Sequence, residues 1–184
     1  MMNTPILNMR DDRKESIVKN TPAIFEIASN ENANGSAPWF EADSQSEVGR
    51  WCGPIIQISK KHGVDPRLTM AIMYMETTHG YYERLYPDFL EDVFPLRKSV
   101  LPMNIHYKYW RKLGVTKNSL NCPHYNIEFG VIILKRIQER INNPTIAKIA
   151  SIYNFIGAEK VTDYGARVSK VYLTQPWKSK GCTQ

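Results

Sequence analysis

The chain has 184 residues, of which 42% are hydrophobic and 23% charged, so it is neither a wholly disordered chain nor a collagen nor a coiled-coil rod. Its length predicts one compact domain with a tail, which buries roughly 70% of the unfolded chain's surface without needing disulfides or metals. Twenty-four Lys and Arg against 18 Asp and Glu give a net charge of +6, which favours a polyanionic partner or environment.

Two functional classes fit these properties poorly. The basic residues are spread along the chain and form no dense block, which disfavours a nucleic-acid-binding protein. No apolar run approaches the roughly 18 residues of a transmembrane helix, so no membrane partner is expected. The first residues show no apolar stretch after a basic start, from which we expect synthesis in the cytoplasm without a signal peptide.

The cysteines and histidines predict neither a metal site nor a cofactor. Cys52, Cys122 and Cys182 are an odd number without short pairwise spacing, which speaks against a zinc ribbon or a redox dithiol. One disulfide together with one free thiol is compatible with this number. Cys122 and His124 flank a proline, and we interpret these three residues as a loop that enters a helix.

Residues 1–46 are mostly polar and are predicted to form an N-terminal arm or linker. They contain one weak apolar patch, at Ile24, Phe25 and Ile27, followed by a run over residues 29–36 that has nothing to bury. The rest of the chain, residues 47–184, is predicted to be the folded domain. Its first two helices are expected over residues 54–63 and 66–80, the second with Asp65 as its N-cap.

No element is predicted for residues 81–104, which are rich in aromatic residues and proline. Helical spacing then predicts a helix within 105–113, a long helix whose apolar face ends at Ile141, a short helix that ends at Asn154, and a last helix over 159–173. Strand signals are poor throughout. The predicted fold class is therefore mainly α.

One carboxylate breaks the pattern of the 66–80 helix. Glu76 lies four residues after Ile72 and eight after Leu68, so its side chain projects at the edge of the apolar face. We also expect Glu76 in the last helical turn, where the negative end of the helix macrodipole opposes a carboxylate. Both effects would raise the pKa of Glu76, as a general acid working near neutral pH requires. A solvated or ion-paired glutamate is the alternative interpretation.

A second polar pair, Tyr153 and Asn154, follows a helix of small residues and precedes Gly157, so that a phenol and an amide can face a cleft. The alternative interpretation is a buried tyrosine with one hydrogen bond and an asparagine that caps its helix. Together with Glu76, the pair points to a functional site.

Four segments, in order along the chain, are similar to motifs of the soluble lytic transglycosylase family within the lysozyme-like superfamily. Residues 63–77 (GVDPRLTMAIMYMET) resemble the family's catalytic-glutamate helix, with Thr77 in place of the serine that usually follows the glutamate. Residues 101–105 (LPMNI) resemble a Gly-Leu-Met-Gln-Ile segment, from which Pro102 and Asn104 depart.

The other two segments follow at suitable distances. Residues 126–130 (NIEFG) resemble an Asn-Ile-x-x-Gly segment that opens the next helix. Residues 150–157 (ASIYNFIG) resemble an Ala-x-x-Tyr-Asn-x-Gly motif with one extra residue before the glycine, and Tyr164 and Val168 continue that pattern. The resemblance covers about residues 54–172 and implies a small lysozyme-like helical domain.

The resemblance further implies that the substrate is bacterial peptidoglycan, cleaved at the β-1,4 bond between N-acetylmuramic acid and N-acetylglucosamine. Glu76 would protonate the leaving oxygen and, in a transglycosylase, would then take the proton of the muramyl 6-hydroxyl as the anhydro ring closes. Tyr153 would touch or orient Glu76, and Asn154 would bind substrate or hold the cleft wall. Asn104 would replace the family's glutamine on the sugar. The same motifs make further substrate-binding candidates of Met103, Asn126 and Tyr164.

Hydrolysis by a muramidase is the alternative to transglycosylation. Inversion needs a second carboxylate roughly 6.5 to 9.5 Å from the first, whereas a retaining nucleophile lies roughly 5 to 5.5 Å away. The irregular segment after the glutamate helix offers four candidates, Glu83, Asp88, Glu91 and Asp92. The sequence leaves both reactions open.

Two other function classes are alternatives to an enzyme: a non-catalytic peptidoglycan-binding module and a basic nucleic-acid-binding helical domain. For the enzyme, the missing signal peptide favours an antibacterial toxin injected into a rival's periplasm, or a phage lysin. The expected partners are then peptidoglycan, the secretion machinery and a periplasmic immunity protein in the producing cell.

Overall fold

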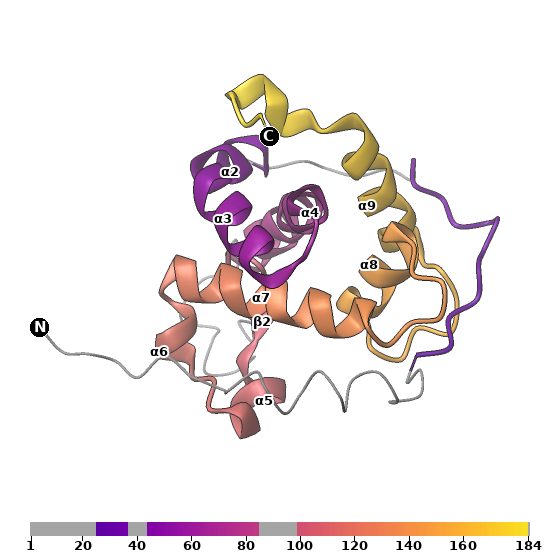
Figure 1. Ribbon diagram of the computed structural model, residues 1–184, viewed down its shortest axis with the longest axis horizontal. Coiled ribbons are helices and arrows are strands. Elements are labelled where there is room, and N and C mark those ends of the chain that lie inside the picture. Colours follow the sequence, from indigo (N-terminus) through magenta and orange to yellow (C-terminus); the bar gives the residue numbers. More distant parts are fainter. Residues whose placement is uncertain (1–24, 37–43, 85–98, 184) are drawn as a thin grey trace, which may run out of the picture.

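The computed structural model describes residues 25–36, 44–84 and 99–183, and this part of the chain is mainly helical, as the sequence predicts (Figure 1). Its first helices are α2 (Ser44–Arg50), α3 (Cys52–His62) and α4 (Pro66–Arg84). A short antiparallel hairpin follows, formed by β1 (Ser99–Val100) and β2 (Ile105–His106). The remaining elements are α5 (Tyr107–Trp110), the 3₁₀-helix η3 (Arg111–Leu113), α6 (Lys117–Leu120), α7 (Pro123–Gln138), α8 (Ile146–Asn154), α9 (Asp163–Thr174) and the 3₁₀-helix η4 (Pro176–Lys180).

Helix α4 is enclosed by the rest of the domain. Asp65 caps its first turn, because the Arg67 amide donates to Asp65 Oδ1 at 2.9 Å, and Pro66 is its first residue, as predicted. Every side chain from residue 68 to residue 77 is buried, and Glu76 is the one charged side chain among them. Helices α2, α3, α7 and α9 all pack against α4, and Figure 1 shows them around it. This packing makes the surroundings of Glu76 almost entirely protein.

Helices α8 and α9 form a tightly packed pair beside α4. Their close approach needs Gly165, since a Cβ atom at this position would lie 2.1 Å from the Ser151 Oγ and 2.3 Å from the Ala147 carbonyl oxygen. This packing therefore fixes the position of the first turn of α9, which contains Tyr164. Because α9 also packs on α4, the hydroxyl of Tyr164 reaches the middle of the domain.

Residues 25–36 lie along the helical domain, whereas the sequence predicts a mostly polar arm or linker over residues 1–46. Phe25 forms an isolated parallel bridge with Ile141, and Ala28 forms one with Lys160. Ile27 is only 7% exposed. Figure 1 shows this segment, in indigo, beside α8 and α9. The predicted boundary at residue 46 therefore does not separate an arm from the domain, because backbone bridges of this kind leave no trace in hydrophobic periodicity.

One disulfide joins distant parts of the chain. Cys52, at the start of α3, is bonded to Cys182 across a sequence separation of 130 residues. Cys122 is an exposed free thiol directly before α7, which begins at Pro123, as predicted for this loop. The three cysteines thus form one bridge and one free thiol, an arrangement that their number allows.

Several short elements differ from the sequence prediction. The expected helix within residues 105–113 is divided into β2, α5 and η3, and the hairpin and the helices α2 and α6 were not predicted. Elements of two to seven residues are too short to show a hydrophobic period. Within the described ranges, no helix combines the length and the apolar character that a membrane-spanning segment requires.

Candidate active site

Glu76 is 3% exposed and lies two turns before the end of α4. The helix continues to Arg84, so the expectation that Glu76 occupies the last helical turn is wrong. The influence of the helix macrodipole falls off within that last turn. Of the two reasons for expecting a raised pKa of Glu76, only burial therefore remains, and the raised value stays a prediction.

Both carboxylate oxygens of Glu76 accept a hydrogen bond from a side chain. The Tyr164 hydroxyl donates to Oε1 at 2.5 Å, and Nδ2 of Asn104 donates to Oε2 at 2.7 Å. These donors come from the start of α9 and from the turn of the β1–β2 hairpin. A carboxyl group with a fixed donor at each oxygen keeps one orientation, as general acid–base catalysis requires. The family resemblance implies that Tyr153 touches or orients Glu76, whereas in the structure the hydrogen bond to Glu76 comes from Tyr164 and the Tyr153 hydroxyl donates to the Met103 carbonyl.

Asn104 reaches the site from a loop that is anchored by other side chains. Its backbone is left-handed, with a φ of 52°, a conformation that asparagine tolerates better than most residues. The amide of neighbouring Met103 donates to Asn126 Oδ1 at 2.9 Å, and the Met103 carbonyl accepts the Tyr153 hydroxyl at 2.8 Å. Asn126 also donates to the Leu120 carbonyl at 3.2 Å. These bonds fix the loop beside the carboxylate.

The substrate-binding role predicted for Met103 and Asn126 stays a prediction, and the structure gives both residues a supporting position. Both are completely buried, and neither lines the pocket described below. Met103 packs so closely on Gly130 that a Cβ atom there would lie 2.8 Å from the Met103 Cγ. The two residues therefore hold the loop that carries Asn104. A motif shows that a position matters and does not tell whether its side chain contacts substrate or backbone.

Two tyrosines near Glu76 are held as neutral hydrogen-bond donors. Burial raises the pKa of Tyr153 well above its ordinary value of 10.0, and the negative charge of Glu76 raises it further. The pKa of Tyr164 is raised well above 10.0 by burial, by the charge of Glu76 and by its hydrogen bond to Glu76. Both hydroxyls therefore stay protonated at neutral pH, and neither acts as a base.

Glu76 borders a pocket of about 830 Å³. Four of its lining side chains are large, apolar and yet exposed: Tyr109 by 73%, Leu113 by 61%, Phe155 by 63% and Ile156 by 55%. Among the described residues only one other large hydrophobic side chain, that of Leu173, is as exposed. Exposed apolar side chains gathered at one pocket mark a binding site.

Helix α7 forms the long wall of this pocket. Its lining residues recur at helical spacing and continue just past the helix end: Phe129, Ile132, Ile133, Arg136, Ile137 and Arg140. The stretch from Phe129 to Ile137 spans roughly 12 Å. The pocket is therefore an elongated groove. Its other described lining residues are Phe25, Asn104, Ile105, His106, Trp110, Ile152, Tyr153 and Asn154.

The structure brings most of the predicted site residues together. Glu76, Asn104, Tyr153 and the exposed Asn154 line the pocket, and Tyr164 contacts Glu76. The aromatic residues of α5 and the arginines that follow along α7 were missed, because only the fold brings them to the groove. For Arg136 and Arg140, the one sequence signal was their i, i+4 spacing at the end of an apolar helix.

The candidates for a second carboxylate lie outside the described part of the structure. Asp88, Glu91 and Asp92 belong to the segment between residues 84 and 99, and of Glu83 only the backbone, within α4, is described. Among the described lining residues, Glu76 is the one carboxylate. The described residues also contain no group of three or more His, Cys, Asp or Glu side chains that could hold a metal ion.

The site thus consists of one buried carboxyl group, two side-chain donors that orient it, and an elongated apolar groove. No family model matches the chain, and no curated protein or solved structure matches it either.

Proposed function

We propose that the protein cleaves the glycan strand of peptidoglycan at the β-1,4 bond between N-acetylmuramic acid and N-acetylglucosamine, with Glu76 as general acid and base. The observation that carries this proposal is the buried carboxyl group of Glu76, oriented by Tyr164 and Asn104 at the wall of an elongated groove. The four motifs that resemble the soluble lytic transglycosylases support the same reaction and a lysozyme-like fold.

In the first step, protonated Glu76 gives its proton to the glycosidic oxygen while the bond from that oxygen to the muramyl C1 breaks. The products of this step are the free 4-hydroxyl of N-acetylglucosamine and an oxocarbenium-like muramyl ring. The Glu76 carboxylate then takes the proton of the muramyl 6-hydroxyl as its oxygen bonds to C1. The 1,6-anhydro ring that results contains no atom from water, and Glu76 is again protonated.

The internal route needs one carboxyl group at the site. Because the 6-hydroxyl of the substrate is the nucleophile, one carboxyl group suffices, and Glu76 is the one carboxylate among the described lining residues. Hydrolysis by inversion would need a second carboxylate to activate water. The Oδ1 atom of Asn104 is buried without a hydrogen-bond partner among the described residues, so it can accept a hydrogen bond from a sugar hydroxyl or N-acetyl group.

The exposed rings along the groove support a sugar chain as the ligand. Tyr109 and Phe155 each combine a large apolar face with high exposure at the pocket. The C–H faces of pyranose rings are apolar, and they pack on aromatic side chains, while the hydroxyl groups find polar partners. A groove with apolar walls and a few polar groups fits such a ligand.

The disulfide supports a place of action outside the reducing cytoplasm. Bonds of this kind persist in oxidising environments such as the bacterial periplasm, and Cys52–Cys182 joins two ends of the domain. We therefore propose an antibacterial effector or lysin that works on peptidoglycan after leaving the cell that makes it. An immunity protein in a producing cell would have to cover the groove.

Digestion of isolated peptidoglycan tests the proposal. The wild-type protein should release soluble muropeptides with anhydro-muramyl ends, which mass spectrometry identifies. Glu76→Gln should release none and still bind the strands. Glu139→Gln is the matched control, because it removes an exposed carboxylate near the end of α7 that does not line the pocket. Reducing ends instead of anhydro ends would indicate a muramidase, and no product from the wild type would reject the enzyme in favour of a binding module.

A further inference from the structure

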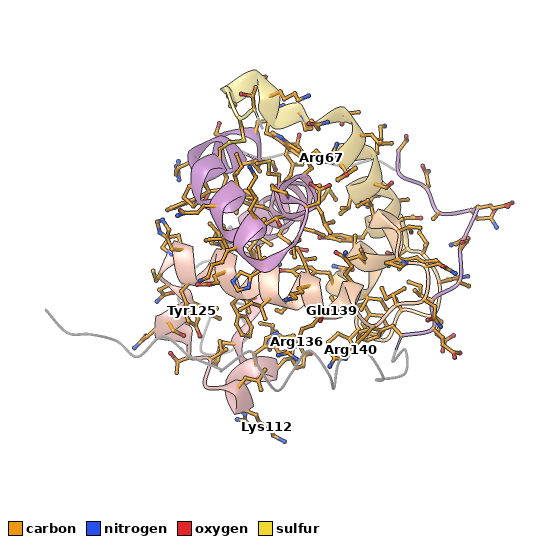
Figure 2. The ribbon with its side chains drawn as sticks, viewed as in Figure 1. Arg67, Lys112, Tyr125, Arg136, Glu139 and Arg140 are labelled. Carbon is orange, nitrogen blue, oxygen red and sulfur yellow. A yellow bond between two sulfur atoms is a disulfide. The ribbon has the colours of Figure 1, made fainter. Side chains whose placement is uncertain are left out.

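Two arginines stand together in the wall of the groove. Arg136 and Arg140 are four residues apart at the end of α7, and both line the pocket that Glu76 borders. Figure 2 shows both, beneath α7 in this view. The site described above gives them no role, since the proposed chemistry needs only Glu76 and its two donors.

Neither arginine has an acidic partner among the residues that the structure describes. Within the described part of the chain, no carboxylate forms an ion pair with Arg136 or Arg140, and Nε of Arg140 is buried without a hydrogen-bond partner. The nearest acidic residue in the sequence, Glu139, is 3.8 Å from the Lys135 Nζ instead. The Glu76 carboxylate accepts from Tyr164 and Asn104. A buried donor without a partner costs free energy, which a bound acceptor would recover.

The surroundings of the two guanidinium groups favour a bound carboxylate. A guanidinium group presents paired N–H donors that match the two oxygens of a carboxylate. Other side chains that line the same pocket, among them Phe155, Ile156 and Ile137, are apolar, and an ion pair is stronger beside apolar walls than in water. The two positive charges therefore select an anionic group of whatever ligand occupies the groove.

In peptidoglycan the sugars themselves are neutral, and the carboxylates belong to the short peptide on the muramyl ring. An extended peptide gains roughly 3.3 to 3.6 Å per residue, so three residues span about 10 Å. The α7 wall between Phe129 and Ile137 spans roughly 12 Å. A peptide of three or four residues on the muramyl ring is therefore comparable in length with this wall.

We infer that Arg136 and Arg140 form a subsite for a carboxylate of the peptide carried by the glycan strand. The position of the two arginines comes from the structure alone, and the identity of the ligand rests on the proposed function. The subsite would make the protein prefer peptide-bearing strands to strands from which the peptides have been removed.

Binding to three forms of the same soluble glycan strand tests this inference: strands with their peptides, strands with the peptide carboxylates converted to amides, and strands without peptides, in which the lactyl carboxylates that peptide removal sets free are also converted to amides. Glu76→Gln protein is used so that the strands stay intact. Adding Arg136→Gln and Arg140→Gln should weaken binding to the first form about tenfold or more, because two charge-assisted contacts are lost. Binding to the other two forms should change less than about twofold.

Lys108→Gln with Lys112→Gln is the matched control. It also removes two positive charges, from exposed residues beside the groove that do not line it (Figure 2 labels Lys112). Arg136→Lys with Arg140→Lys should restore part of the binding, which shows that a loss does not come from misfolding. Equal losses with the control, or equal losses on all three strands, would overturn the inference. So would competition by a soluble glycerol-phosphate polymer together with no preference for peptide-bearing strands, which would identify phosphate as the anion.

The two proposals fail in different ways. If the wild type cleaves the strands but the arginine variant binds all three forms as tightly as its parent, the subsite is wrong and the enzyme stands. If the wild type cleaves none of them but binding depends on both the peptides and the arginines, the enzyme is wrong and the subsite stands.

Discussion

The Tyr164 hydroxyl donates a 2.5 Å hydrogen bond to Oε1 of Glu76, although 88 residues separate the two side chains in the sequence. Tyr153, which lies in the more recognisable motif, donates to the Met103 carbonyl instead. The two tyrosines therefore have separate tasks. Tyr164 orients the carboxyl group, and Tyr153 holds the loop that carries its other donor, Asn104.

This division predicts different effects for the two tyrosine-to-phenylalanine substitutions. Tyr164→Phe removes a hydrogen bond to a charged group and should lower kcat about 10- to 100-fold with little change in KM. The hydrogen bond from Tyr164 stabilises the ionised form of Glu76, so its removal should raise the pKa of Glu76. The pH–rate profile should therefore move to higher pH. Tyr153→Phe should cause a smaller loss without that movement. Steady-state kinetics on soluble glycan strands between pH 4 and 9 measure both, and identical profiles for the two variants would contradict the division.

Asn104 offers a test in which backbone and side-chain effects can be separated. Asn104→Ala removes a hydrogen-bond donor to Glu76. It also puts alanine at a left-handed φ of 52°, which alanine adopts less readily than asparagine. Asn143→Ala is the matched control, since Asn143 has the same φ of 52° and is exposed away from the pocket. Each variant should lose about 1 kcal/mol of unfolding free energy, and only Asn104→Ala should lose activity. An equal loss of activity in both would mean that backbone strain, and not the hydrogen bond, is responsible.

Breaking the disulfide should destabilise the protein strongly. Cys52 and Cys182 close a loop with a sequence separation of 130 residues. The chain-entropy model gives such a loop about 5 kcal/mol, and native disulfides typically contribute about 2 to 4 kcal/mol. Paired Cys52→Ser and Cys182→Ser substitutions should lower the midpoint of urea unfolding accordingly, whereas Cys122→Ser should leave it unchanged because that thiol is free and exposed. An unchanged midpoint in the paired variant would show that the bond adds no stability.

The stability of the fold should decrease in acid through Asp65. Burial raises the pKa of Asp65, but hydrogen bonds from Tyr172 and Arg67 outweigh this effect and hold the pKa below its ordinary value of 3.8. Because the folded-state pKa is the lower one, the ionised group stabilises the fold above about pH 4, and this contribution is lost as the pH falls through the folded-state pKa. Asp65→Asn keeps an N-cap residue and removes the charge.

Urea unfolding of the wild type and Asp65→Asn at several pH values measures this effect. The variant should be less stable at pH 7, and the difference should shrink between about pH 4 and pH 2. Glu139→Gln serves as the comparison and should change the stability little at any of these pH values. Its carboxylate is exposed and lies 3.8 Å from its partner Lys135, and exposed ion pairs contribute little to stability. A constant difference between wild type and Asp65→Asn over this range would rule out the proposed contribution of the charge.

The sequence predicted features that depend on a regular apolar spacing or on residues close together in the chain. The apolar spacing identified α4, the pattern Asp65–Pro66 identified its start, and the unusual carboxylate identified Glu76. The end of α4 was placed too early, since the chain after Gly80 offers no clear apolar face by which to extend the helix. That error produced the mistaken position of Glu76 in a last turn.

The contacts at the site could not be predicted, because they join residues that are distant in the sequence. The motifs named Tyr153, Tyr164 and Asn126 without showing which of them reaches the carboxyl group. That choice depends on how closely α8 and α9 approach, which Gly165 permits, and on the turn that carries Asn104. Phe25 joins the groove through a backbone bridge to Ile141, and backbone pairing of this kind depends little on side-chain identity.

The covalent link between Cys52 and Cys182 also limits how the molecule can travel. It closes a ring that contains α4, α7, α8 and α9, so a chain with this bond cannot be drawn out into one extended thread. A pore wide enough for a single extended strand would stop such a molecule at the bonded cysteines. Passage through a narrow pore therefore requires that the bond form afterwards, on the far side, whereas a machine that carries folded cargo can move the ring intact.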